Sequence, residues 1–312
     1  MRTANLMLKS FQLSANNFIR SFTVKASVIT ALALLSGCLV HGGDVKTYMR
    51  ETDNIHLYQA DDFIEYNVSG HYIAGMTSFP AVSGTLRIEW SIPSPLYDPI
   101  INKLLTENVL KEVSTLSLNG NETTTVRYIS QDMDGSIYLH AFGKNGTYYY
   151  WVNDNGTTPP KPTAALNKVK LWQSPLVADG SHISNTFHVF DNCDATNLCN
   201  MHLGYQTETD TVESDNYNIQ TDSGVFNTFR VSFSGNKQLD TGSGLAGFPI
   251  DLDLRSSCGH NNANFSGTAY FYPQVGFVLM TVHCADAAGY PAFDYNFEFK
   301  RAGGSITLPS PS

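Results

Sequence analysis

The N-terminal part of this sequence has no negative charge and no long hydrophobic run. Residues 1–43 contain no aspartate or glutamate, whereas four basic side chains lie in the same stretch. The apolar segment 26–37 has about a dozen residues, short of the roughly 20 that a membrane-spanning helix needs. A basic start, a short apolar segment and small residues after it are typical of a secretory signal peptide. We therefore expect residues 1–37 to be a signal peptide.

The sequence also lacks the short motifs of common enzyme classes. It contains no Gly-x-Ser-x-Gly nucleophile elbow and no His-Glu-x-x-His pair, and the glycine-rich segment 241–247 lacks the Lys-Ser/Thr of a phosphate-binding loop. The histidines in or beside predicted strands do not converge in sequence; they include His140, His182, His188 and His283. We expect no catalytic residue, no metal site and no cofactor, although a triad of residues distant in sequence remains an alternative.

Positive charge is scarce in the rest of the chain. Without the four basic residues of the leader, 15 of the 19 Lys and Arg remain against 28 Asp and Glu, a formal charge of −13. A surface this acidic does not attract nucleic acid or anionic lipid. We therefore expect no nucleic-acid partner, and membrane association only through an anchor.

The first of five cysteines stands at the end of the leader. The residues Leu35, Ser36, Gly37 and Cys38 resemble the lipobox of bacterial lipoproteins. The resemblance implies cleavage before Cys38, acylation of its thiol and amino group with palmitate-type chains, and a tether over residues 38–46. Two or three acyl chains give a stable membrane anchor. The absence of aspartate after Cys38 favours the outer membrane, with the protein facing the periplasm. A transmembrane helix, or an ordinary signal with an incidental cysteine, is the alternative.

The other four cysteines are Cys193, Cys199, Cys258 and Cys284. An even number in an exported chain indicates disulfide bonds, with three possible connectivities. Spacing favours Cys193 with Cys199 and Cys258 with Cys284, and a zinc site is the weaker alternative because the spacings are not finger-like. In segment 191–197, Asp191, Asp194 and Asn197 offer oxygen ligands that calcium accepts, but such residues are also common in turns, which we favour.

Alternation of apolar and polar residues dominates the chain from residue 85 onward. It is clear in segments 85–90, 229–233, 250–255 and 293–300, where every second side chain is apolar. A period of two with one polar face is typical of antiparallel sheet. Asp-Gly and Asn-Gly at 134–135 and 145–146 predict tight hairpin turns.

These patterns predict a mainly β protein built on one large curved antiparallel sheet. Segment 275–284 is apolar on both faces and is expected to lie centrally. We expect a single β domain over residues 47–302 and a flexible tail over 303–312.

One segment has helical spacing instead. Apolar residues recur every three or four positions between Ile100 and Leu116, and Asp98 followed by Pro99 is typical of a helix start. The pattern predicts one amphipathic helix over about 99–115, packed on the apolar face of the sheet.

Two segments resemble a wider group of bacterial lipoproteins. Residues 81–90 and the hairpin 267–280 are similar to strands of lipoproteins with the half-barrel fold of the lipoprotein-localisation carriers. The resemblance implies a half-barrel, for which a sandwich is the alternative, with a concave face that holds acyl chains.

Two functional hypotheses follow. The first is a non-catalytic envelope lipoprotein, anchored in the outer membrane, that binds a protein partner or has a structural role. The second is a carrier or receptor for a lipid or other hydrophobic ligand held on the concave face of the sheet.

Overall fold

The computed structural model divides the chain into two compact units, residues 1–45 and 46–312. The residues it describes are 45–74, 77–78, 81–92, 97–98, 103–104, 109–144, 147–153, 169–180, 182–191, 201–239, 262–286 and 291–311.

The described part of the second unit consists of strands and their connections, and it contains no helix. The strands are β1 (Thr47–Tyr48), β2 (Phe63–Ala74), β3 (Thr77–Ser78), β4 (Val82–Ser91), β5 (Tyr97–Asp98), β6 (Lys103–Leu104), β7 (Val109–Leu118), β8 (Asn121–Gln131), β9 (Ile137–Lys144), β10 (Thr147–Asn153), β11 (Val169–Trp172), β12 (His182–Asp191), β13 (Met201–Thr221), β14 (Gly224–Leu239), β15 (Asn262–Tyr272), β16 (Gly276–Asp286) and β17 (Pro291–Gly303).

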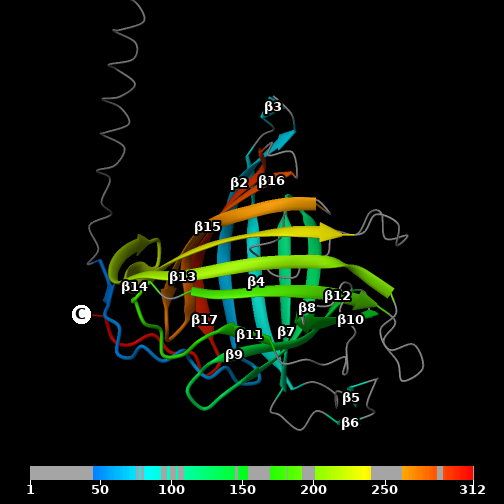
Figure 1. The fold of residues 1–312 in the computed structure, drawn as a ribbon. Helices are drawn as coiled ribbons and strands as arrows, with labels where there is room; N and C mark the ends of the chain where they lie inside the picture. Colours follow the sequence, from blue (N-terminus) through cyan, green and yellow to red (C-terminus); the bar gives the residue numbers. More distant parts are fainter. Residues whose placement is uncertain are drawn as a thin grey trace, which may run out of the picture. The chain divides into compact units, whose positions relative to one another are not determined.

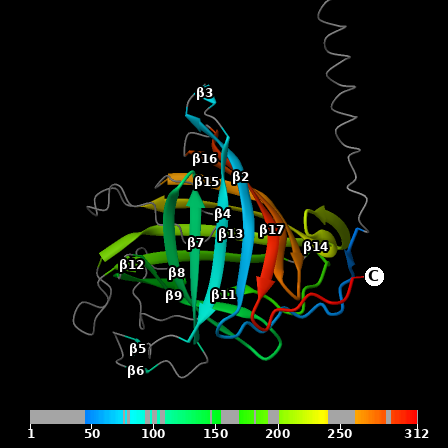
Figure 2. The same cartoon turned by 180° about the vertical axis from the view of Figure 1, so that it is seen from behind.

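Almost all of these strands belong to one large sheet. Its hydrogen-bonded order is β14-β13-β12-β10-β9-β8-β7-β4-β2-β17-β16-β15, and β14 also pairs with β15. The sheet is strongly curved: Figure 1 shows β13, β14 and β15 passing in front of β2, β4 and β7, and Figure 2 shows the same crossing from behind. The predicted class, a mainly β protein with a large curved antiparallel sheet, is confirmed.

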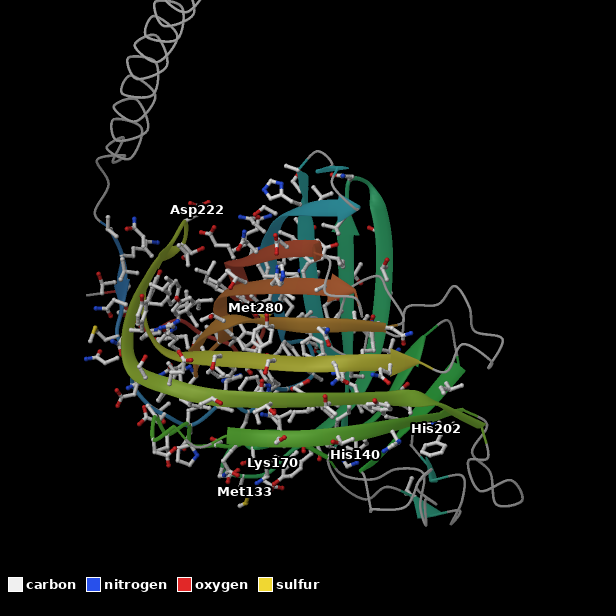
Figure 3. All side chains as sticks on the ribbon, turned by 45° about the horizontal axis from the view of Figure 1, so that its top comes forward. Met133, His140, Lys170, His202, Asp222 and Met280 are labelled. Atoms are coloured by element: carbon white, nitrogen blue, oxygen red, sulfur yellow. The ribbon has the colours of Figure 1, made fainter. Side chains whose placement is uncertain are left out.

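The core lies between the two facing parts of the sheet. Leu86 on β4 and Phe229 and Val231 on β14 belong to a single buried cluster, each at most 1 % exposed. Met280 on β16 lies among the same packed side chains (Figure 3). Burying one such side chain contributes about 1.5–3 kcal/mol. The alternating strands of the sequence therefore turn one face inward, as antiparallel sheets do.

Four glycines of the sheet lie under aromatic rings of the neighbouring strand. Phe233 lies opposite Gly267, and two positions along the same strand pair Phe265 lies opposite Gly235. A Cβ atom at either glycine would come 2.4 Å from the facing ring. Gly70 under Tyr295 and Gly303 under Phe63 repeat the arrangement between β2 and β17.

Both predicted hairpins are present. β8 and β9 are joined around Gly135, which has φ of 94°, and β9 pairs with β10 from Lys144 opposite Thr147. Segment 275–284 forms most of β16, a central strand between β15 and β17, with one face fully and the other partly buried. The strand predicted over 250–255 lies outside the described residues.

The helix predicted over 99–115 is wrong for residues 109–115. These residues belong to β7, which pairs with β4 on one side and β8 on the other; Val113 lies opposite Glu89 and Val126. Residues 103–104 form β6, paired with β5. β-branched residues such as Val109 and Val113 suit a pleated sheet, and pairing on both edges outweighs a weak helical spacing. Residues 99–102 and 105–108 lie outside the described part.

The C-terminal segment, expected as a flexible tail from residue 303, packs against the domain over its first residues. β17 continues to Gly303, Ser305 donates hydrogen bonds to the buried Asp62, and Ile306 belongs to the core. The expectation of a free tail is therefore corrected for residues 303–306.

Candidate functional site

A pocket of about 250 Å³ lies beside the short strand β11 and is the candidate functional site. It is bounded by the end of β11, by the segment 173–179 that follows, and by β12 and β13. We call it the β11–β13 pocket. Its wall includes Trp172, Leu176, Asp179, Ile183, Asp210 and Val212. Sites for drug-sized ligands have volumes of about 300–1,000 Å³, and this pocket is slightly smaller.

The segment after β11 is fixed to the rest of the domain by hydrogen bonds of Ser174 and Leu176. The hydroxyl of Ser174 accepts from the backbone N–H of Ile55 at 3.0 Å and donates to the carbonyl oxygen of Asp134. The N–H of Leu176 donates to the carbonyl of Asp53 at 3.0 Å. These bonds join the pocket wall to two distant segments, so its geometry is preformed.

Trp172 forms the aromatic wall of the pocket. Its ring lies 5.3 Å from that of Phe271 and 5.6 Å from that of Phe277, measured between ring centroids. Such tilted and edge-on contacts hold a large ring in one orientation. Lys170, two residues earlier on β11 (Figure 3), binds Gln173 through its ammonium group and is not part of the pocket lining.

The polar part of the pocket is acidic. Asp210 is 4 % exposed and lies opposite Ile183 across the β12–β13 pair, and Asp179 lies on the segment after β11. None of the described lining residues is basic. Asp210 belongs to a series of buried polar side chains on one face of β13, with Gln206 and Glu208 before it. The amide of Gln206 donates to the carboxylate of Glu208 at 3.2 Å.

A second polar group lies inside the sheet, on β7 and β8. Glu112 is 3 % exposed and accepts a hydrogen bond from the guanidinium of Arg127 at 2.7 Å.

Tyr58 lies near this ion pair. Its ring stacks on that of Trp90, with ring centroids 4.0 Å apart, and its hydroxyl donates a hydrogen bond to the carbonyl of Val275. Burial, and then the negative charges of Glu112 and Asp62, raise the pKa of Tyr58 well above its usual range. Tyr58 therefore stays protonated and acts as a donor.

His56, Asp62 and Ser305 meet in a cluster that contains the residue types of a catalytic triad. The same Nε2 atom of His56 contacts both the Asp62 carboxylate, at 3.4 Å, and the Ser305 hydroxyl, at 3.3 Å. In a triad the acid and the nucleophile contact different ring nitrogens. Here the Ser305 hydroxyl lies 2.9 Å from the carboxylate and donates to it directly, so the cluster fastens the C-terminal segment and does not activate a nucleophile.

Of the predicted site residues, the structure describes only Cys284. It lies on β16 and is fully buried. Cys38, Cys193, Cys199 and Cys258 lie outside the described residues, so lipidation and disulfide pairing stay predictions. Asp194 and Asn197 also lie outside them, so the choice of a turn over a calcium site in segment 191–197 is untested. His188 and His202 lie on neighbouring strands, with the Nδ1 of the first 3.0 Å from the Nε2 of the second. Within the described ranges, no group of three or more His, Cys, Asp or Glu is arranged to hold a metal ion.

The concave face of the sheet was the predicted position of a hydrophobic ligand. In the described residues, its inward side chains pack against one another; Phe226, Phe229 and Phe271 are each at most 2 % exposed. The β11–β13 pocket was not predicted. It combines residues 172–183 with Asp210 and Val212 of β13, and β13 is polar along nearly its whole length, so the sequence gives no sign of which face is inward.

No helix in the described part of the chain is long and apolar enough to cross a membrane.

Comparison with known proteins yields only distant similarity in fold. No protein-family model matches the chain, and no curated protein matches it. Among solved structures, the chain is similar to a candidate exported protein with a YmcC-like fold from Bacteroides fragilis, at 10 % identity and a TM-score of 0.35, over 80 % of this chain and 99 % of that one. It is also similar to a candidate lipoprotein from Parabacteroides distasonis, at 10 % identity and a TM-score of 0.31, over 80 % and 100 %. Similarity at this level carries no functional argument.

Proposed function

We propose that the chain is a lipid-anchored envelope protein that acts by binding and has no catalytic role. The observation that carries the proposal is the leader of residues 1–37, which has no acidic residue and ends in Leu-Ser-Gly before Cys38. In this proposal the Cys38 thiol bears the acyl chains, and the β domain is held at the outer membrane by the tether 38–46. Two or three acyl chains suffice for stable anchoring.

The site geometry supports a binding role. The β11–β13 pocket has walls fixed by buried hydrogen bonds and by packed aromatic rings. In the cluster of His56, Asp62 and Ser305, which has the residue types of a triad, the hydroxyl donates to the carboxylate. A preformed pocket without an activated nucleophile suits recognition of a ligand or partner.

Metabolic labelling with palmitate tests the anchor. We expect label on the wild-type chain and none on Cys38→Ser, while Ser36→Ala, which keeps a small residue before the cleavage site, retains it. Leu39→Asp is expected to move the protein from the outer to the inner membrane fraction. Label that persisted on Cys38→Ser, or a native precursor that stayed uncut, would contradict the proposal.

We further propose that the remaining cysteines pair as Cys193 with Cys199 and Cys258 with Cys284. The even count in an exported chain supports pairing, and the burial of Cys284 suits a structural bond. Non-reducing peptide mass mapping should find these two cross-linked pairs; four alkylatable thiols in the folded protein would exclude them.

A further inference from the structure

We propose that the outer side of the sheet, over β13–β17 and β2, binds a neutral polysaccharide, and that Tyr217 and Tyr270 form the platform for one of its sugar rings. The proposal goes beyond the binding role given above, because it assigns a ligand class to a surface other than the β11–β13 pocket. It does not depend on the anchor at Cys38.

Strand register builds this surface. One row of directly opposed residues crosses the neighbouring strands β13, β14, β15, β16, β17 and β2; its members are Thr211, Ser232, Thr268, Thr281, Asn296 and Ser69. All of them are half-buried or exposed, whereas their neighbours along the strands, such as Val231 and Phe297, are buried. The row therefore lies on the outer side of the sheet, which β13, β14 and β15 turn away from β2 and β4 (Figure 1). We call this row and its two neighbouring rows the hydroxyl–amide face.

The two neighbouring rows continue the pattern on β13, β14 and β15. They consist of Thr209, Ser234 and Ser266, and of Thr207, Asn236 and Asn264. None of these positions is charged. Neighbouring strands lie about 4.7–4.9 Å apart, so the rows place hydroxyl and amide groups at short, regular intervals.

The hydroxyl–amide face offers hydrogen-bonding groups that the protein itself does not use. Among the described residues, the side chains of Thr211, Ser232, Asn296 and Ser69 make no hydrogen bond within the domain. Hydroxyl and amide groups can both donate and accept. Sugar hydroxyls have the same double capacity, so a polysaccharide can pair with many of these groups without removing any charge from water.

A pair of tyrosines lies beside the rows. Tyr270 follows Thr268 by two residues on β15 and lies on the same side of the sheet, and its ring centroid is 5.1 Å from that of Tyr217. Tyr217 is 39 % exposed, and the contact between the two rings limits their movement. A sugar ring has an apolar C–H face that can pack on an aromatic ring while its hydroxyls reach polar neighbours. The tyrosine pair and the rows therefore suit the two kinds of surface that a sugar presents.

The charges near the face are balanced within the protein. Arg230, opposite Tyr270, binds Glu213 at 3.2 Å, and Asp294, two residues before Asn296, contacts His283. The three rows contain no cation for an anionic polymer. They also contain no apolar side chain, whereas the centre of a protein interface is mostly apolar. A neutral polyhydroxylated polymer matches this surface better than a nucleic acid, a lipid or a protein.

Affinity electrophoresis in native gels tests the proposal, with the full chain purified from membranes and held in lipid nanodiscs. The gels contain dextran, glucomannan or xyloglucan as neutral polysaccharides, alginate as an anionic one, or no polymer. We expect at least one neutral polysaccharide to slow the protein relative to empty nanodiscs, and alginate not to slow it. Retardation by none of the neutral polymers, or retardation by alginate as strong as by the best neutral one, would overturn the proposal.

Variants then locate the site. Tyr217→Ala removes the exposed ring of the platform, and Ser69→Ala combined with Asn296→Ala removes two opposed hydrogen-bonding groups; each is expected to weaken binding at least about fivefold. The matched control is Thr123→Ala combined with Thr124→Ala, at two exposed positions of β8 outside the rows, which should leave binding unchanged. If circular dichroism shows that Tyr217→Ala does not fold, the Ser69 and Asn296 double variant decides alone. Wild-type affinity in every face variant that folds would place the polysaccharide elsewhere and refute the site.

Discussion

Phe233 on β14 covers Gly267 on β15, and its ring occupies the space that a side chain at position 267 would need. A Cβ atom there would lie 2.4 Å from the ring and 2.0 Å from the carbonyl oxygen of Thr281. Two residues further along the same strand pair, the roles are exchanged, and Phe265 on β15 covers Gly235 on β14. Each strand therefore places one aromatic ring over a glycine of the other. Rings over cross-strand glycines are a known means of fixing strand register.

Gly267→Val is therefore expected to destabilise the domain by about 1–3 kcal/mol or more, because the new side chain meets a ring and a backbone oxygen that have no room to move. Phe233→Ala is expected to cost about 3–5 kcal/mol through loss of burial and an unfilled space. Urea unfolding followed by tryptophan fluorescence measures both. Ser234→Ala, an exposed neighbour on β14, is the control and should change stability by less than about 0.5 kcal/mol.

Removing the carboxylate of Glu65 is expected to change the acid stability of the domain. Hydrogen bonds from Arg301 and then from Arg87 lower the pKa of Glu65 to about 2, from 4.5. Because the folded pKa lies below the unfolded one, this stabilisation is present above about pH 4.5 and is lost as the pH falls towards 2. Glu65→Gln should therefore be less stable than wild type at pH 7, and the difference should shrink below pH 4. Glu122→Gln, at an exposed position, should show no such trend; a constant difference for Glu65→Gln across this range would contradict the assignment.

Tyr58→Phe is expected to affect the alkaline limb of the stability profile. Tyr58 has a folded pKa raised above 10, so its contribution is complete below pH 10 and is lost as the pH rises further. The variant keeps the ring over Trp90 and loses the hydrogen bond to Val275, at a cost of about 1 kcal/mol at neutral pH. Thermal unfolding between pH 7 and 11 should show a smaller alkaline decrease in Tm for the variant. If Tm decreased equally in the variant and the wild type, groups other than Tyr58 would control the alkaline loss of stability.

Asp62→Ala is expected to release the C-terminal segment. The Asp62 carboxylate accepts from the backbone N–H groups of Gln59, at 2.8 Å, and Ser305, at 2.5 Å, as well as from the Ser305 hydroxyl. Hydrogen bonds to a charged acceptor contribute about 1.5–3 kcal/mol each, and the donors left behind are partly buried. Hydrogen exchange at Ser305 and Ile306 should become much faster than in Asp215→Ala. Unchanged protection there would show that Ile306 packing alone holds the segment.

The sequence predicted those parts of the fold in which local pattern and pairing agree. In segments 85–90, 229–233 and 293–300 every second residue is apolar, and these segments lie in β4, β14 and β17 as expected. The region around Val113 has an ambiguous pattern, because residues spaced by three or four positions can also alternate over short stretches, and pairing with β4 and β8 decided the outcome. The β11–β13 pocket was beyond sequence reasoning, since Trp172, Ile183 and Asp210 meet only through tertiary packing.

The pairing of β2 with β17 has a consequence for how the domain reaches its folded state. Arg301 binds Glu65, 236 residues earlier in the chain, and Phe63 lies opposite Gly303. β2 is the first long strand to be synthesised, and one of its edges stays unpaired until β17, the last strand, has been made. Contacts of such large sequence separation slow folding because a long loop must close first. If the chain is exported as proposed, the domain completes its sheet only after nearly the whole chain has crossed the inner membrane. Until β17 has arrived, the unpaired edge of β2 needs protection from pairing with other chains.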